Sequence, residues 1–153
     1  MWKAYAIVGA VLAALVAAAS ASSQPLARTF AIPLSAAEEV PDCPATNEGD
    51  RGVALFEIVD VAAGIVEYKV IASDLPGELA GAPGVHIHGP APAGRTAGIV
   101  EPLTRTGAEV GVIASGTFTD AELVADALAN PELFYVNVHT TTCPAGAIRG
   151  QFA

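Results

Sequence analysis

The segment FYVNVH at residues 134–139 alternates two kinds of side chain. Every second position is apolar, and the positions between them hold tyrosine, asparagine and histidine. Because successive side chains of a β-strand point to opposite faces, this period of two predicts a strand with one inward apolar face and one polar face. The segment VHIH at residues 85–88 alternates in the same way, so His86 and His88 share the polar face of a second predicted strand.

The rest of the chain carries further strand signals separated by turn residues. Residues 60–64 form a predicted hairpin turn in which Gly64 is free to take a positive φ, and residues 35–50 form a long predicted loop. Strands are predicted at 30–34, 52–59, 65–72, 98–103, 110–118 and 147–152. Together with the two strands described above, the chain has about eight predicted strands and one short helix. This pattern predicts an all-β fold, specifically an antiparallel Greek-key β-sandwich.

The single predicted helix covers about residues 120–129. It is preceded by a capping box in which the Thr119 hydroxyl accepts from the Glu122 amide and the Glu122 carboxylate reaches back. Asn130 and Pro131 mark its end, because proline cannot continue a helix.

The first residues have the layout of a secretory signal peptide. Lys3 supplies a positive start, residues 4–19 contain no charge, and Ala19 and Ala21 form a small-x-small cleavage site. We therefore expect a signal peptide over 1–21 and a single domain over 22–153, secreted or periplasmic. The alternative is an uncleaved N-terminal membrane anchor, although the apolar run is shorter than the about 20 residues that a span needs.

The overall charge disfavours two classes of partner. The 153 residues contain 7 Lys+Arg and 16 Asp+Glu, which gives a net charge of −9. Nucleic acids and anionic membrane surfaces are bound mainly by lysine and arginine, so neither is an expected partner.

The two cysteines, Cys43 and Cys143, allow one pairing. Each is followed by proline, which places both in loops, and export makes a disulfide permissible. We expect the disulfide. The alternatives are that one thiolate is a soft metal ligand, or that Cys143 forms a catalytic dyad with His139.

The three histidines of the chain are the main candidates for chemistry. If the two alternating strands are neighbours, the imidazoles of His86, His88 and His139 converge, and three histidines suit Zn²⁺ or Cu²⁺. Glu38 and Glu39 are candidates for a fourth ligand. The alternative is that these histidines bind no metal and are hydrogen-bonded to loop backbone.

Other catalytic templates fail. The chain has no Gly-x-Ser-x-Gly elbow, the glycine–proline run at 89–94 lacks the amide donors of a phosphate loop, and its carboxylates are scattered. Arg149, within the last predicted strand, is expected to form a buried ion pair; the alternative is that it contacts a partner.

Four ordered segments resemble the motifs of the chordin-type CHRD domain family. The resemblance covers nearly the whole chain after the signal. The segments are LSAAEEVP at 34–41, VHIHGP at 85–90, FYVNVHT at 134–140 and PAGAIRGQ at 144–151. The resemblance implies an extracytoplasmic, immunoglobulin-like all-β domain. In animals such domains occur in secreted inhibitors that bind growth factors, and in microbes they often stand alone.

The family motifs also carry over to individual residues. They include the three histidines and the polar residues Asn137, Thr140 and Arg149. Ala147 departs from the pattern, because the family has a glutamate there, and the two cysteines are not part of the core motifs.

The leading hypothesis is a non-enzymatic secreted or periplasmic CHRD module that binds copper or zinc through its histidines. One alternative is an interaction module that binds another extracytoplasmic protein and no metal. The other is a dismutase-like metalloenzyme, which rests only on fold analogy.

Overall fold

The computed structural model describes residues 28–153, so the expected signal peptide lies outside the described residues. The described chain forms one eight-stranded antiparallel sheet with one α-helix and two 3₁₀ turns. The strands are β1 (Arg28–Ser35), β2 (Arg51–Asp60), β3 (Ile65–Ser73), β4 (Val85–His88), β5 (Ile99–Pro102), β6 (Gly111–Thr119), β7 (Tyr135–Val138) and β8 (Ile148–Gln151). The predicted strands are all present, with ends that differ by one or two residues.

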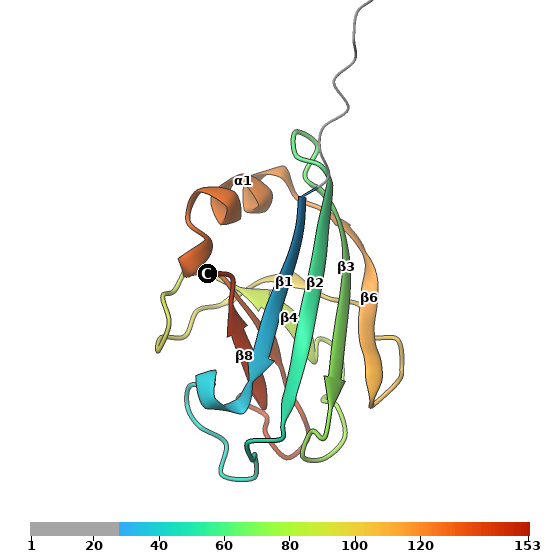
Figure 1. Cartoon of the computed structure of the whole chain (residues 1–153), viewed down its shortest axis with the longest axis vertical. Helices are drawn as coiled ribbons and strands as arrows, with labels where there is room; N and C mark the ends of the chain where they lie inside the picture. Colours follow the sequence, from blue (N-terminus) through green and yellow to red (C-terminus); the bar gives the residue numbers. More distant parts are fainter. Residues whose placement is uncertain (1–27) are drawn as a thin grey trace, which may run out of the picture.

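The strand order is β5-β4-β7-β8-β1-β2-β3-β6, and the sheet is curled. Figure 1 shows the short strand β4 behind the long strands β1 and β2. The inner faces of both halves meet in one core that includes Ile32, Phe56, Val70, Val85, Val136 and Ile148.

The prediction of an all-β antiparallel fold of about eight strands with one short helix is confirmed, whereas the division into two Greek-key sheets is not. Between β8 and β1 the two halves are joined by a single residue pairing, Ser35↔Arg149, whereas β1 pairs with β2 along its length. A Cβ atom at Gly150 would lie 2.0 Å from the carbonyl oxygen of Pro33, so this junction requires glycine.

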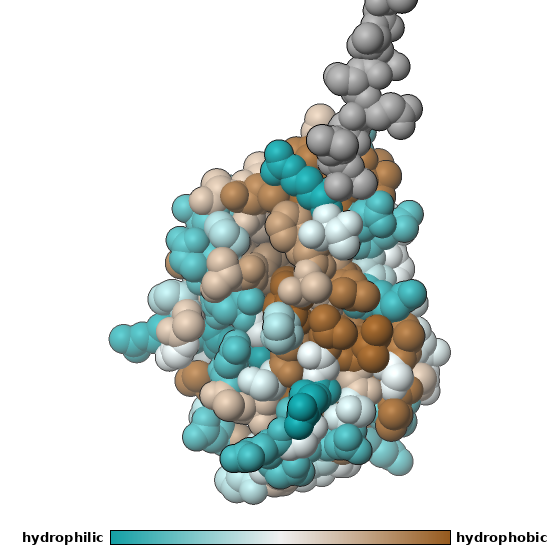
Figure 2. Space-filling view, in the orientation of Figure 1, coloured by the Kyte–Doolittle hydropathy of each residue, from teal (hydrophilic) through white to brown (hydrophobic). Residues whose placement is uncertain are grey.

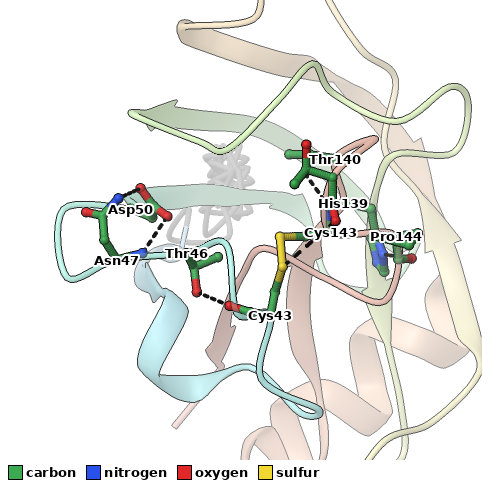
Figure 3. The surroundings of a disulfide bond; sticks show 9 residues. Cys43, Thr46, Asn47, Asp50, His139, Thr140, Cys143 and Pro144 are labelled. Atoms are coloured by element: carbon green, nitrogen blue, oxygen red, sulfur yellow. Dashed lines mark hydrogen bonds between the residues drawn. A yellow bond between two sulfur atoms is a disulfide. The ribbon is translucent and has the colours of Figure 1, made fainter.

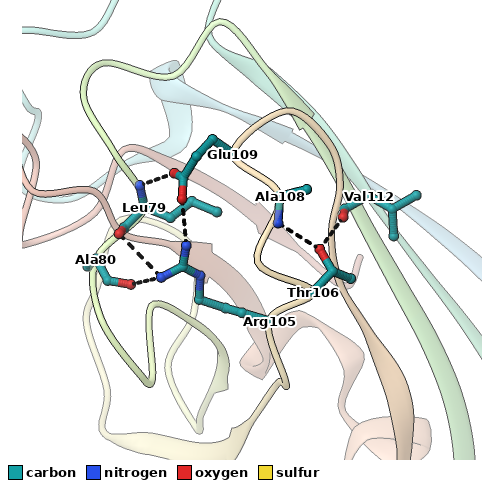
Figure 4. Close-up of polar contacts among 7 residues, drawn as sticks. All are labelled: Leu79, Ala80, Arg105, Thr106, Ala108, Glu109 and Val112. Atoms are coloured by element: carbon teal, nitrogen blue, oxygen red, sulfur yellow. Dashed lines mark hydrogen bonds and ion pairs between the residues drawn. The ribbon is translucent and has the colours of Figure 1, made fainter.

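The two outer edges of the sheet meet beyond β5. The Leu103 amide donates to the Val85 carbonyl at 2.9 Å, and the Thr106 amide donates to the Ile113 carbonyl of β6 at 3.0 Å. Next to this junction, the Arg105 guanidinium donates to the Ala80 carbonyl at 2.9 Å and to Glu109 at 2.8 Å (Figure 4). The segment that follows β5 is therefore hydrogen-bonded to β6, the strand at the other edge of the sheet.

The outer face of the long half carries a modest apolar area. Figure 2 shows brown side chains gathered over the lower parts of β2, β3 and β6. The outward-facing residues there, Val53, Leu55, Ile71 and Val112, are half-buried.

The helix α1 (Ala121–Ala129) confirms the predicted element but not the predicted cap. Its N-cap is Asp120, whose carboxylate accepts from the Leu123 amide at 2.9 Å. Thr119 cannot serve as the N-cap because it still pairs with Ile65 as the last residue of β6. The helix ends at Asn130, and the turn η2 (Pro131–Leu133) follows.

The long predicted loop contains the turn η1 (Ala36–Glu38) and is held by the expected disulfide. Cys43 and Cys143 are bonded, which joins this loop to the turn that follows β7 (Figure 3). In that turn the buried Thr140 hydroxyl accepts from the Cys143 amide at 3.0 Å. Thr140 therefore shapes the turn, and neither cysteine is free to act as a ligand or nucleophile.

Candidate metal centre

The three histidines lie together on one face of the short half of the sheet. His86 and His88 belong to β4, whose residues pair antiparallel with β7. His139 directly follows β7 and continues the ladder, because its amide donates to the Gly84 carbonyl at 2.8 Å. One ring nitrogen of each histidine lies within 4.8 Å of the corresponding nitrogens of the other two. The predicted convergence of the imidazoles is confirmed.

Backbone carbonyls fix which nitrogen carries the proton in two of the three rings, those of His88 and His139. Nδ1 of His88 lies 2.8 Å from the Ala97 carbonyl, and Nδ1 of His139 lies 3.0 Å from the Pro144 carbonyl. The backbone of Pro83, which offers only a carbonyl, favours the protonated form of His86. Since a carbonyl can only accept, each anchored nitrogen is the donor, and the other nitrogen of a neutral ring carries a lone pair.

One buried nitrogen of each ring has no hydrogen-bond partner among residues 28–153. The atoms concerned are Nδ1 of His86, Nε2 of His88 and Nε2 of His139. Buried polar atoms in proteins are nearly always paired, so three unpaired ring nitrogens in one place require an explanation. A bound cation satisfies all three at once, and orientation of each ring by its second nitrogen is the usual outer-shell arrangement of a metal site.

The environment keeps these rings neutral at pH 7. Burial lowers the pKa of His86 to about 3, and repulsion from the rings of His139 and His88 adds to this effect. Burial also lowers the pKa of His88 and of His139. A neutral imidazole is the form that binds metal, so the group is ready to bind without losing protons.

The polar face that carries the histidines is buried, contrary to the expectation that it lies outside. His86 is 4% exposed and His88 is 8% exposed. The covering segment is the loop between β4 and β5, where the Ala97 carbonyl accepts from His88 and the Ala97 amide donates to the Tyr135 hydroxyl at 3.0 Å. The loop replaces water as the hydrogen-bonding partner of this face.

A stack of flat side chains extends from the cluster across β7 to β8. The ring of Tyr135 lies parallel to that of His88, with centroids 4.8 Å apart. On the β8 side, the Arg149 guanidinium carbon lies 3.4 Å from the centre of the Tyr135 ring. Sequence reasoning placed Tyr135 on the polar face but gave it no role.

The predicted ion pair of Arg149 is wrong. Arg149 is 1% exposed, yet it donates to the Arg95 carbonyl at 2.7 Å and to the Gln151 side-chain oxygen at 2.9 Å. No carboxylate within residues 28–153 forms a salt bridge with it. Its charge is stabilised by neutral acceptors and by the Tyr135 ring.

The two glutamates considered as a fourth ligand do not join the cluster. The group of converging ligand atoms within residues 28–153 contains the three histidines alone. Glu39 is buried and accepts from the Asn137 side chain at 3.2 Å, and burial raises the pKa of Glu39 to about 7. Glu38 is exposed at the edge of β8. Glu39 is therefore hydrogen-bonded to Asn137 and lies outside the group of converging ligand atoms.

The fold and the site together define a small all-β domain with a group of two buried histidines and one half-buried histidine on one sheet face. The chain belongs to the CHRD domain family, whose sequence model matches residues 30–152. No curated protein and no solved structure matches the chain. Among the described helices, α1 included, none has the length and apolar character that crossing a membrane requires.

Proposed function

We propose that this protein is an exported CHRD module that holds one copper or zinc ion through His86, His88 and His139. The observation that carries the proposal is the convergence of the three imidazoles: one ring nitrogen of each histidine lies within 4.8 Å of those of the other two, and each ring has a buried nitrogen with no hydrogen-bond partner among residues 28–153. Neutral imidazole suits both metals, and Cu²⁺ generally binds nitrogen sites more tightly than Zn²⁺. Three protein ligands leave a further coordination position open, as in zinc sites that accept an outside ligand.

Metal analysis of purified protein tests the proposal. The protein is loaded separately with Cu²⁺ and Zn²⁺, dialysed, and analysed for bound metal. We expect one equivalent in the native protein and a loss of at least 100-fold in affinity for His88→Ala, since two ligands cannot replace three. Tyr135→Phe is the matched control, because it lies in the same stack, keeps its ring and should bind one equivalent. Equal, substoichiometric metal in all three proteins contradicts the proposal.

The proton balance of binding provides a second test. Because the three pKa values lie below the ordinary value, the rings are already deprotonated at pH 7 and binding should release no protons there. Calorimetric titration in two buffers of different ionisation enthalpy measures this directly. Release of one or more ring protons per ion at pH 7 contradicts the lowered pKa values, because it would mean that the metal-free rings are protonated there.

Family membership favours a second candidate, an interaction module that binds another extracytoplasmic protein. A protein that takes up no metal but retains a stable partner in a pull-down supports this candidate. Superoxide turnover by the copper-loaded protein, above that of free copper, would instead indicate a dismutase-like enzyme; we expect none.

Export is part of the proposal, and two findings support it: the disulfide and the family match. Mass spectrometry of the protein isolated from its cells should find a mature chain that begins at Ser22. A chain that keeps its first residues supports the uncleaved anchor.

A further inference from the structure

A second concave site lies inside the curled sheet, on the side of β4 opposite the histidines. It is a pocket of about 270 Å³ between α1 and the inner face of the sheet. Figure 1 shows α1 lying across the upper end of the strands, beside β1. Every residue that lines the pocket is apolar, and the walls include Ile32, Phe56, Ile87, Phe118, Leu128 and Phe152.

The pocket is held open by attachments at both ends of α1. At the start of the helix, the Asp120 amide donates to the Gly64 carbonyl at 3.0 Å, and a Cβ atom at Gly64 would lie 2.2 Å from the Ala121 amide nitrogen. Beyond its end, the Glu132 carbonyl accepts from the Gln151 side chain at 2.6 Å. The helix is therefore fixed to the β2–β3 turn and to β8 and cannot move down into the gap.

Because α1 is attached at both ends, part of its apolar face is not fully buried. Four apolar residues of α1 line the pocket: Leu123 and Val124, near the fixed first turn, are buried, whereas Ala127 and Leu128, in the last turn, are only half-buried. Phe30 also lines the pocket and is 39% exposed. Apolar side chains that could pack together are instead left around an open volume, which is unfavourable unless something apolar occupies it.

We propose that this pocket binds the hydrocarbon group of a small uncharged molecule. The walls offer no charged or polar side chain, so a charged group has no partner inside. The net charge of −9 further disfavours anionic ligands such as fatty-acid carboxylates. An apolar cavity of about 150 Å³ binds benzene, so a pocket of 270 Å³ fits a larger group, such as a medium-length alkyl chain or a two-ring aromatic.

The pocket and the histidine cluster are independent sites. Ile87 points into the pocket, and its neighbours His86 and His88 point to the other face of β4. Metal-free protein should therefore bind the apolar ligand as well as metal-loaded protein does.

Fluorescence titration with the uncharged probe N-phenyl-1-naphthylamine tests the proposal on the mature protein. We expect saturable binding of one probe per chain and displacement by decanol, with decanoate at least 10-fold weaker. Ala127→Phe fills the pocket from the helix and should weaken probe binding at least 10-fold. Ala125→Phe places the same side chain on the exposed side of the same helix and should stay within twofold of the native protein.

Several results overturn the proposal. The first is the absence of saturable probe binding by the native protein, and the second is equal binding by Ala127→Phe and Ala125→Phe. The third is a pocket covered by a second copy of the chain, which would be seen as a dimer that Ala127→Phe dissociates. Equal displacement by decanoate overturns the assignment to uncharged ligands. If Ala127→Phe does not fold, the melting temperature of the native protein tests the proposal instead. Decanol bound in the pocket should raise it in a concentration-dependent way, and no rise contradicts the proposal.

Discussion

The two faces of the β4–β7–β8 half are equally buried, yet they are stabilised in different ways. On the inner face, Val85, Val136 and Ile148 are 0% exposed and pack against other apolar side chains. On the outer face, His86 and Arg149 are almost as inaccessible, at 4% and 1%, but contact loop carbonyls and a tyrosine ring. The inner face makes only apolar contacts, as most protein cores do, whereas the outer face leaves three imidazole nitrogens without a hydrogen-bond partner. Burial alone therefore does not distinguish a core from a site.

Acid should affect the outer face most. The pKa of His86 is lowered from 6.5 to about 3 in the folded protein. Between these pH values the imidazole is therefore protonated in the unfolded chain but not in the folded protein, which favours unfolding. Stability of the metal-free protein should be unaffected above pH 6.5 and should fall, as pH drops from 6.5 to 3, by roughly 4 kcal/mol through this residue. Urea unfolding at several pH values, in the presence of a chelator, measures the loss.

His86→Asn is the comparison for this prediction, since asparagine does not titrate. The variant should lose less stability than the native protein over the same pH range. Parallel pH profiles for the two proteins would show that His86 does not carry the effect.

A truncation on the inner face should have the next largest effect. Ile148→Ala removes a fully buried side chain and should lower the free energy of unfolding by about 3 kcal/mol, through lost burial and the cavity it leaves. Metal uptake should remain at one equivalent, because the side chain points away from the histidines. Loss of metal from a variant that is still folded would show that the two faces are coupled.

Glu39→Gln should stabilise the protein at alkaline pH. The folded pKa of Glu39 is raised from 4.5 to about 7, so the native protein loses stability as pH rises from 4.5 to 7 and remains destabilised above that. Glutamine keeps an oxygen that can accept from Val40 and Asn137 but never ionises. We expect a gain of about 2 kcal/mol at pH 8 and little gain at pH 4. A pH-independent difference in unfolding free energy would contradict the assigned pKa.

The smallest effect is expected from Tyr135→Phe. The variant loses only the hydroxyl that accepts from the Ala97 amide at 3.0 Å, and Ala97 is half-buried, so water can replace the acceptor. The cost should be about 1 kcal/mol in thermal or urea unfolding. A loss well above this value would mean that the hydroxyl, and not the ring, holds the loop over the site.

The period-two pattern was sufficient to predict the strands and the shared face of the histidines. It depends on local geometry, and the convergence of His86, His88 and His139 needed only that two neighbouring strands pair. The single sheet could not be predicted in this way, because the β1–β8 junction joins residues at opposite ends of the domain. Nor could the cap at Asp120, since both Thr119 and Asp120 are good capping residues and only the length of β6 decides between them.

The nature of the outer face was also beyond the sequence pattern. Polar alternation usually indicates solvent, and here a loop rich in glycine and proline covers the face. The partner of Arg149 is a carbonyl 54 residues away, and nothing about the type of residue 95 marks it as an acceptor.

The protein atoms that orient the rings of His88 and His139 are main-chain oxygens of Ala97 and Pro144. Every amino acid supplies the same oxygen, so exchanging the side chains at these positions leaves the orienting contacts in place while the loop path is kept. In a saturation-mutagenesis scan for metal binding, substitutions of the histidines should therefore have large effects, and substitutions at the residues that supply the orienting oxygens should have almost none. Related chains could therefore preserve the orientation of these two rings with different residue types at positions 97 and 144.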